Sequence, residues 1–178
     1  RTRIFDIYEE ESISPRTGKA IKFNTIECHC SWVNIIAVTS DNELVLVKQY
    51  RHGSKKVEIE TPGGCIDENE PPLDAAIREL REETGYMGEK ARVIGKVSPN
   101  PAIQGNYCYV VLIENAIKTN NTDMDEGEDL LTITKSYKDV EKMVLNGEIT
   151  HGIVLNALYM YKLITENKKC VEWKVHMS

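Results

Sequence analysis

The hydrophobic pattern divides the chain into many short segments with the period of a strand and three longer ones with the period of a helix. Residues 33–39 and 43–50 are nearly continuous apolar runs, which are typical of buried strands. Residues 3–10 and 21–28 flank turn-forming residues at 14–19, so they predict an antiparallel hairpin or meander. Further strands are predicted at residues 56–60, 91–96, 107–114 and 130–134.

The first helical segment follows Pro71-Pro72, which favour a helix start, and ends before Gly85, which favours a helix stop. One face of this helix is formed by Leu73, Ala76, Ile77, Leu80 and Thr84. Two more helices are predicted at residues 137–145 and 149–164. The order of elements predicts an α/β fold, namely an α/β/α sandwich with a mixed sheet and an N-terminal antiparallel strand region. Without a repeat or a linker, residues 1–178 form a single predicted domain.

The composition narrows the class of protein. A length of 178 residues with 41% hydrophobic content is typical of a globular protein with a proper core. The net charge of −6 disfavours nonspecific binding to nucleic acid, which needs a basic face. No apolar run approaches the roughly 18 residues that span a bilayer. Five cysteines, an odd number, favour reduced thiols in a cytoplasmic protein. We therefore expect a small-molecule enzyme.

Three carboxylates in the first helical segment carry the candidate chemistry. Glu79, Glu82 and Glu83 stand at positions i, i+3 and i+4, so a helix places them on one face within one turn. Like charges at this spacing repel unless something positive neutralises them. A hard divalent cation with oxygen ligands does so, and Mg²⁺ prefers such ligands. The spacing therefore indicates a metal site.

Residues 64–86, called here the Nudix box, match the box of the Nudix hydrolases without a gap. The matching positions are Gly64, Glu70, Arg78, Glu79, Leu80, Glu82, Glu83, Gly85 and Tyr86. The likeness extends to residues 32–37, 47–53, 60–64, 125–129 and 147–151. Over about residues 1–166 the chain resembles the ADP-ribose pyrophosphatase branch of this superfamily.

The resemblance implies a Mg²⁺- or Mn²⁺-dependent hydrolase that cleaves the pyrophosphate of ADP-ribose, or of a related nucleoside diphosphate sugar. It maps the metal ligands onto Glu79, Glu82 and Glu83 and onto the backbone carbonyl of Gly63. Arg78, four residues before Glu82, is expected to hold that carboxylate rather than to be a solvated helix charge. The resemblance also implies a homodimer that pairs through the strands within about residues 1–30.

The resemblance places the general base in the acidic segment 125–129, with Glu126 as first choice and Glu128 as second; the segment could equally be a solvated loop. Arg51 matches a substrate-binding arginine, since a guanidinium suits phosphate, although it could be a surface charge. Glu60 matches a position near the same pocket. Trp32 either stacks on adenine or packs beside a strand.

Several alternatives remain open from the sequence. The chain could be a non-catalytic Nudix module that binds nucleotide sugars, a hydrolase of GDP-mannose-type sugar nucleotides, or a hydrolase of damaged nucleoside triphosphates. A zinc site at Cys28-His29-Cys30 is disfavoured, because a strand sends the cysteines to one face and His29 to the other, and no second cysteine pair is at hand.

Overall fold

The structure, a computed structural model, describes residues 2–119, 121–123 and 129–167. In chain order its elements are β1 (Phe5–Ile13), β2 (Ala20–Cys28), β3 (Trp32–Thr39), β4 (Glu43–Arg51), β5 (Lys56–Glu60), α1 (Pro72–Thr84), β6 (Tyr86–Met87), β7 (Lys90–Val97), β8 (Cys108–Lys118), β9 (Leu130–Ser136), α2 (Tyr137–Leu145) and α3 (Gly152–Asn167). Among the described residues, no helix combines the length and the apolar character that crossing a membrane requires.

The central sheet is mixed, as the sequence predicts. Its main path runs β5-β4-β3-β8-β6, while β7 pairs with β8 and β9 pairs with β4. Strands β3 and β8 are parallel, with Trp32 opposite Cys108 at one end. The pairs β4–β5, β4–β9 and β7–β8 are antiparallel. The apolar runs that predict buried strands therefore lie at the centre of the sheet.

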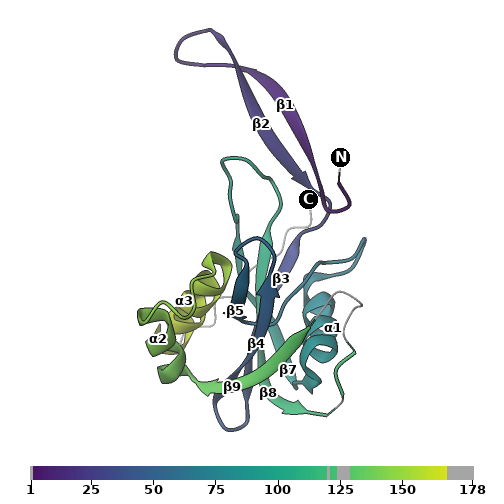
Figure 1. The fold of residues 1–178 in the computed structure, drawn as a ribbon, viewed down its shortest axis with the longest axis vertical. Helices are drawn as coiled ribbons and strands as arrows, with labels where there is room; N and C mark the ends of the chain where they lie inside the picture. The colour runs from purple at the N-terminus through teal and green to yellow at the C-terminus, as the bar shows by residue number, and fades with distance from the viewer. Residues whose placement is uncertain (1, 120, 124–128, 168–178) are drawn as a thin grey trace.

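Alternate residues of the central strands face two separate cores. In β3, Ile35 packs on the side of α1, whereas Ile36 packs on the side of α2 and α3. In β8, Val111 and Leu112 divide in the same way. Figure 1 shows α1 on one side of the sheet and α2 with α3 on the other. This confirms the predicted α/β/α sandwich.

Helix α1 begins after Pro71 and ends at Gly85, whose φ of 72° is the left-handed conformation that glycine adopts easily. Its buried face includes Ala75, Ala76 and Leu80. Ile77, which belongs to the apolar stripe, is 40% exposed, so the stripe is wider than the buried face. The buried face is centred on Ala76, Leu80 and Glu83, which stand at i, i+4 and i+7. Ile77 follows Ala76 directly in the sequence, so its side chain points away from the centre of that face.

The N-terminal strands form a hairpin separate from the main sheet. β1 pairs with β2 from Phe5 opposite Cys28 to Ile13 opposite Ala20. Figure 1 shows this hairpin extending away from the sandwich. Its main attachment is at the base, where the backbone N–H of Ile26 donates to the carbonyl of Ile103 at 2.6 Å. Apolar side chains along it are exposed, among them Ile7, Tyr8, Ile13, Ile21 and Phe23.

A disulfide joins Cys30, just before β3, to Cys65, just after the glycine pair of the loop that follows β5. The two Cα atoms lie 5.9 Å apart, although the residues are 35 positions apart in sequence. They meet because Trp32 bridges Cys65 through the backbone. The expectation of reduced thiols is therefore wrong for this pair, and the thiol count no longer supports a reducing compartment. It also takes Cys30 out of any pairing with His29 for zinc.

Candidate active site

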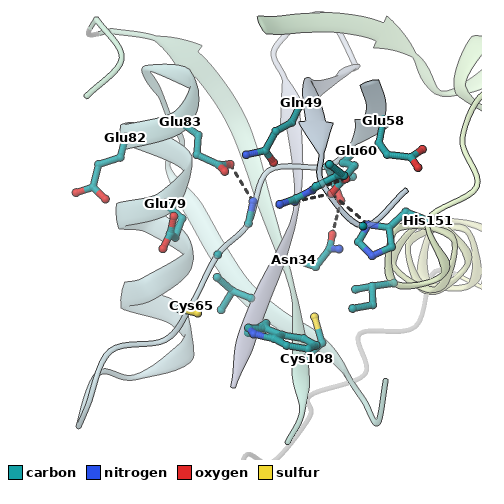
Figure 2. A pocket seen from close by; sticks show the side chains of 18 of the residues that line it. Asn34, Gln49, Glu58, Glu60, Cys65, Glu79, Glu82, Glu83, Cys108 and His151 are labelled. Carbon is teal, nitrogen blue, oxygen red and sulfur yellow. Dashed lines mark hydrogen bonds and ion pairs between the residues drawn. The ribbon is translucent and has the colours of Figure 1, made fainter. Parts of the chain in front are cut away.

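A cavity of about 1090 Å³ lies between α1, the ends of β4 and β5, and the start of α3 (Figure 2). Pockets that enclose small-molecule ligands are typically about 300–1,000 Å³, so there is room for a molecule as long as a nucleotide sugar. All the predicted site residues within the described part of the chain line it, namely Trp32, Arg51, Glu60, Gly63, Arg78, Glu79, Glu82 and Glu83. The two candidates for the general base, Glu126 and Glu128, lie outside the described residues.

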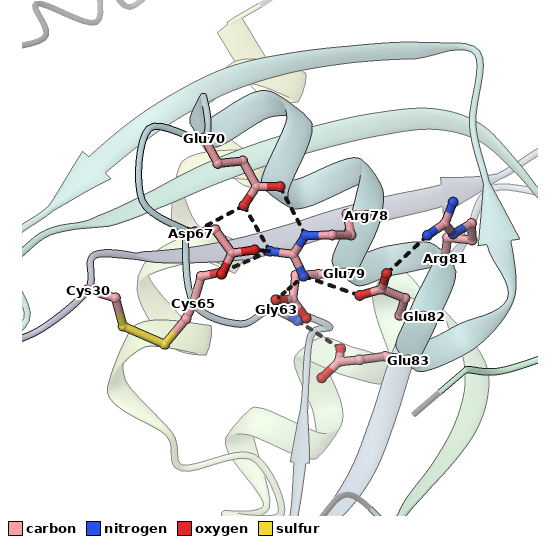
Figure 3. A network of polar contacts seen from close by, with 10 residues as sticks. All are labelled: Cys30, Gly63, Cys65, Asp67, Glu70, Arg78, Glu79, Arg81, Glu82 and Glu83. Carbon is pink, nitrogen blue, oxygen red and sulfur yellow. Dashed lines mark hydrogen bonds and ion pairs between the residues drawn. A yellow bond between two sulfur atoms is a disulfide. The ribbon is translucent and has the colours of Figure 1, made fainter. Parts of the chain in front are cut away.

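Arg78 is the centre of the polar network on the α1 wall (Figure 3). Its Nε and Nη2 donate to the two carboxylate oxygens of Glu70, each at 2.9 Å, while Nη1 donates to Glu79 at 2.9 Å and to Glu82 at 3.2 Å. Nη2 also donates to the backbone carbonyl of Cys65 at 3.1 Å. These hydrogen bonds, that of Glu70 first, raise the pKa of Arg78. One guanidinium thus offsets much of the repulsion among the clustered carboxylates.

Glu83 is tied to the loop opposite α1. It is 3% exposed, and its Oε2 accepts a hydrogen bond from the backbone N–H of Gly63 at 3.0 Å. The carbonyls of Pro62 and Gly64 accept hydrogen bonds from backbone N–H groups of β3. In an extended chain neighbouring carbonyls point to opposite sides, whereas the N–H and C=O of one residue point to the same side. The Gly63 carbonyl therefore faces α1, beside Glu83.

Gly64, the first residue of the Nudix box, leaves space for a carboxylate. A Cβ atom built on Gly64 would overlap the carboxylate group of Glu79. The box begins with glycine here because the loop backbone passes directly against the acidic face of α1. The same close approach brings the carbonyl of Gly63 toward that face.

The oxygen donors on this wall suit a hard divalent cation such as Mg²⁺ or Mn²⁺, since carboxylates and a backbone carbonyl are the ligands such ions prefer. In the described ranges no three acidic, histidine or cysteine side chains are arranged around one point as metal ligands. Glu79 and Glu82 instead contact Arg78, and Glu83 contacts Gly63. In this arrangement a guanidinium and an amide compensate the negative charge.

The opposite wall is built around Glu60, the last residue of β5, whose side chain is 4% exposed. Arg51 donates to both of its oxygens, from Nε and Nη2, at 2.8 Å each. His151 Nδ1 lies 3.1 Å from the second oxygen. Burial by itself would raise the pKa of Glu60, but the hydrogen bonds from Arg51 and His151 lower it to about 2. The carboxylate is therefore ionised and held between two donors.

Some residues of the cavity were not foreseen as site residues. The backbone N–H of Asp123, two residues before the acidic segment 125–129, donates to the carbonyl of Glu82 on α1 at 2.8 Å. Asn34 and Thr61 hydrogen-bond each other behind the Gly63 loop. His151 lines the cavity because α3 begins at Gly152, not at residue 149 as the apolar pattern predicts. Its only sequence signal was its place in the matching segment 147–151.

Comparisons to known proteins give the family to which this chain belongs. The family model of the NUDIX domain matches residues 31–148, and the chain belongs to this family. It is 30% identical to the ADP-ribose pyrophosphatase of Bacillus subtilis, covering 90% of this chain and 86% of that protein. It is 33% identical to the ADP-sugar pyrophosphatase of Mus musculus over 60% of this chain and 53% of that protein.

The fold is also similar to that of a solved structure over almost the whole chain. The crystal structure of an ADP compounds hydrolase matches with a TM-score of 0.84 at 20% identity, covering 96% of this chain and 91% of that one. The chain is a Nudix hydrolase similar to ADP-ribose pyrophosphatases. Proteins of this family generally use divalent metal ions.

We predict that Gly64→Ala weakens metal binding, because the added methyl group displaces the Glu79 carboxylate. The Kd for Mn²⁺, measured by calorimetry, should rise roughly 10–100-fold while the protein stays folded. Gly105→Ala is the matched control, since a Cβ there meets nothing within 4 Å. Equal Mn²⁺ affinity in the two variants would contradict the tight approach of the loop to α1.

We also predict an acid-dependent loss of stability through Glu60. Its pKa is about 2 in the folded protein against an ordinary 4.5, so its ionisation contributes about 3 kcal/mol above pH 4.5. This contribution falls away as the pH drops from 4.5 toward 2. In denaturant titrations the gap between wild type and Glu60→Gln should therefore narrow over that range. A gap that stays constant from pH 5 to pH 2 would refute the low pKa.

Proposed function

We propose that the protein hydrolyses the pyrophosphate bond of a nucleoside diphosphate sugar, with ADP-ribose as the first substrate and AMP and ribose 5-phosphate as products. The observation that carries this proposal is the cavity with two unlike walls: three glutamates of α1 line one side, and an arginine held by a buried carboxylate of β5 lines the other. A diphosphate needs its charge neutralised on several sides, which such walls provide. The likeness to ADP-ribose pyrophosphatases supports this substrate class.

In this proposal Mg²⁺, or Mn²⁺, is held by Glu79, Glu82, Glu83 and the carbonyl of Gly63. The bound ion would supply charge neutralisation of the diphosphate and a more acidic water. Arg78 orients the Glu79 and Glu82 carboxylates, to both of which it donates hydrogen bonds. Water attacks one phosphorus of the bridge, the bond from that phosphorus to the bridging oxygen breaks, and the second phosphate leaves with that oxygen.

The general base is proposed to be Glu126, with Glu128 as the second choice. A carboxylate of ordinary pKa is a weak base, but it suffices for a water that is already acidified. The position of Asp123 supports this assignment, because that residue precedes Glu126 by three positions and its backbone N–H donates to the carbonyl of Glu82 on α1.

Substrate binding is assigned to the wall of the cavity away from α1. Arg51 presents a planar guanidinium, held in one orientation by Glu60, to a substrate phosphate. Trp32 is partly exposed, lines the cavity and starts β3, and we propose that its ring stacks on the adenine. The substrate thus extends from the carboxylates of α1 toward the end of β4.

We predict that Glu83→Gln removes most turnover, by roughly 100-fold or more, because it loses an anionic oxygen ligand while remaining similar in shape. The assay follows AMP formation from ADP-ribose with Mg²⁺ by chromatography. Glu68→Gln, an exposed glutamate of the same Nudix box, should keep wild-type turnover. Removing the metal with a chelator should stop the reaction, and adding Mg²⁺ should restore it.

The same assay separates the alternatives. Tight binding of ADP-ribose without turnover would identify a binding module, and faster cleavage of GDP-mannose would change the preferred substrate. Pyrophosphate or orthophosphate release from nucleoside triphosphates would indicate a hydrolase of damaged nucleoside triphosphates. Near-normal turnover in Glu83→Gln would contradict the metal assignment.

We further propose that the protein is a homodimer formed through the β1–β2 hairpin. A lone two-stranded hairpin is marginally stable in water, and the apolar side chains of Tyr8, Ile21 and Phe23 share one face because of the strand register. We predict a light-scattering mass of about twice the 20.2 kDa chain mass. Phe23→Glu should shift the mass toward the monomer. A monomeric wild-type protein would refute the proposal.

A further inference from the structure

Glu60 is a buried carboxylate, so its negative charge needs hydrogen-bond donors or a positive partner close by. Its side chain is 4% exposed, and an unpaired buried charge is strongly destabilising. Arg51 provides two parallel hydrogen bonds, yet 45% of the Arg51 side chain remains exposed at the cavity. The orientation of the guanidinium therefore depends on how firmly the Glu60 carboxylate is held. A second contact to that carboxylate from another element would fix the pair.

His151 makes that second contact. Its Nδ1 atom is shut off from solvent and lies 3.1 Å from the Glu60 carboxylate, while within the described part of the chain no aligned hydrogen bond satisfies it. A nitrogen lone pair facing a carboxylate oxygen would be repulsive, so Nδ1 carries the proton in either charge state of the ring. The Nδ1–H group is therefore the one that faces the Glu60 carboxylate.

The backbone positions of both residues are fixed by regular structure. Glu60 pairs with Val47 at the end of β5, and the His151 carbonyl accepts the hydrogen bond from Leu155 that opens α3. Figure 2 shows His151 at the end of α3, with its ring directed at Glu60. The contact therefore joins the α3 layer to the sheet edge that carries Arg51. The His151 side chain as a whole is 38% exposed and lines the cavity.

We propose that His151 is a positioning residue for substrate binding. By donating from Nδ1 to Glu60 it holds that carboxylate, and through it the Arg51 guanidinium, in the orientation that receives a substrate phosphate. The contact lies on the wall away from the glutamates of α1, so it sets ground-state affinity rather than the rate of bond cleavage. This inference rests on the proposed function, because it assigns Arg51 to a phosphate.

The test compares three substitutions of one residue. Asparagine places an N–H where Nδ1 stands in histidine, whereas alanine removes it and glutamine places it one atom further out. His151→Ala should raise the KM for ADP-ribose about tenfold, the size expected for a lost hydrogen bond to a charged group, with kcat changed less than about twofold. His151→Asn should restore the wild-type KM, and His151→Gln should not.

A second readout needs no turnover. Calorimetry with ADP as the probe, without metal, should give Kd values that follow the same order as the KM values. His29→Asn is the matched control, because His29 lies at the base of the hairpin and its Nδ1 contacts the backbone carbonyl of Arg3. Thermal unfolding of each variant checks that the proteins are folded.

Several results would overturn the inference. They are a wild-type KM and Kd in His151→Ala, an affinity in His151→Asn as poor as that of His151→Ala, or a wild-type protein that binds no ADP. The outcome is separable from that of the proposed function. If wild type binds ADP but does not cleave ADP-ribose, the proposed reaction fails, while the Kd series still decides the role of His151.

Discussion

The site depends on a positive partner for the three neighbouring carboxylates on helix α1. The spacing of the three box glutamates places like charges within one turn of α1, which costs stability unless a positive partner lies close. Arg78 is that partner in the structure, and Glu70 holds the guanidinium from its other side, so that the hydrogen bond to Arg78 lowers the pKa of Glu70. In this arrangement one guanidinium holds the Glu79 and Glu82 carboxylates on the same face of the helix. Carboxylates gathered in this way are the oxygen ligands that a hard cation prefers.

The sandwich gives the cavity two walls with opposite character. The loop after β5 passes close enough to α1 that a Cβ on Gly64 would overlap the Glu79 carboxylate, and the backbone N–H of Gly63 donates to Glu83. The other wall, from the ends of β4 and β5 and the start of α3, holds Arg51 through the buried Glu60. The disulfide of Cys65 anchors the loop that separates the two walls. One sheet edge therefore sets the distance between the acidic wall and the arginine.

The sequence predicts the parts of this arrangement that depend on local spacing. Helical period and the gapless box predict the acidic face of α1, and apolar runs predict the central strands. Contacts between distant segments were not predictable: Cys30 and Cys65 meet only once β3 is paired with the loop. The exposure of Ile77 was not predictable, because apolar spacing defines a stripe but not which edge of it faces the sheet. His151 was assigned to a helix because an apolar pattern does not show that the helix starts at Gly152, three residues after the predicted start.

The central claim is that the three box glutamates exist to hold divalent ions over a diphosphate. Its most direct test is a crystal structure of the protein with Mg²⁺ and an ADP-ribose analogue whose bridging oxygen is replaced by methylene. The account predicts at least one ion bound by carboxylates of Glu79, Glu82 and Glu83 and by the diphosphate oxygens. A structure with the analogue bound, no ion on α1 and these carboxylates still paired with Arg78 and Gly63 would contradict it.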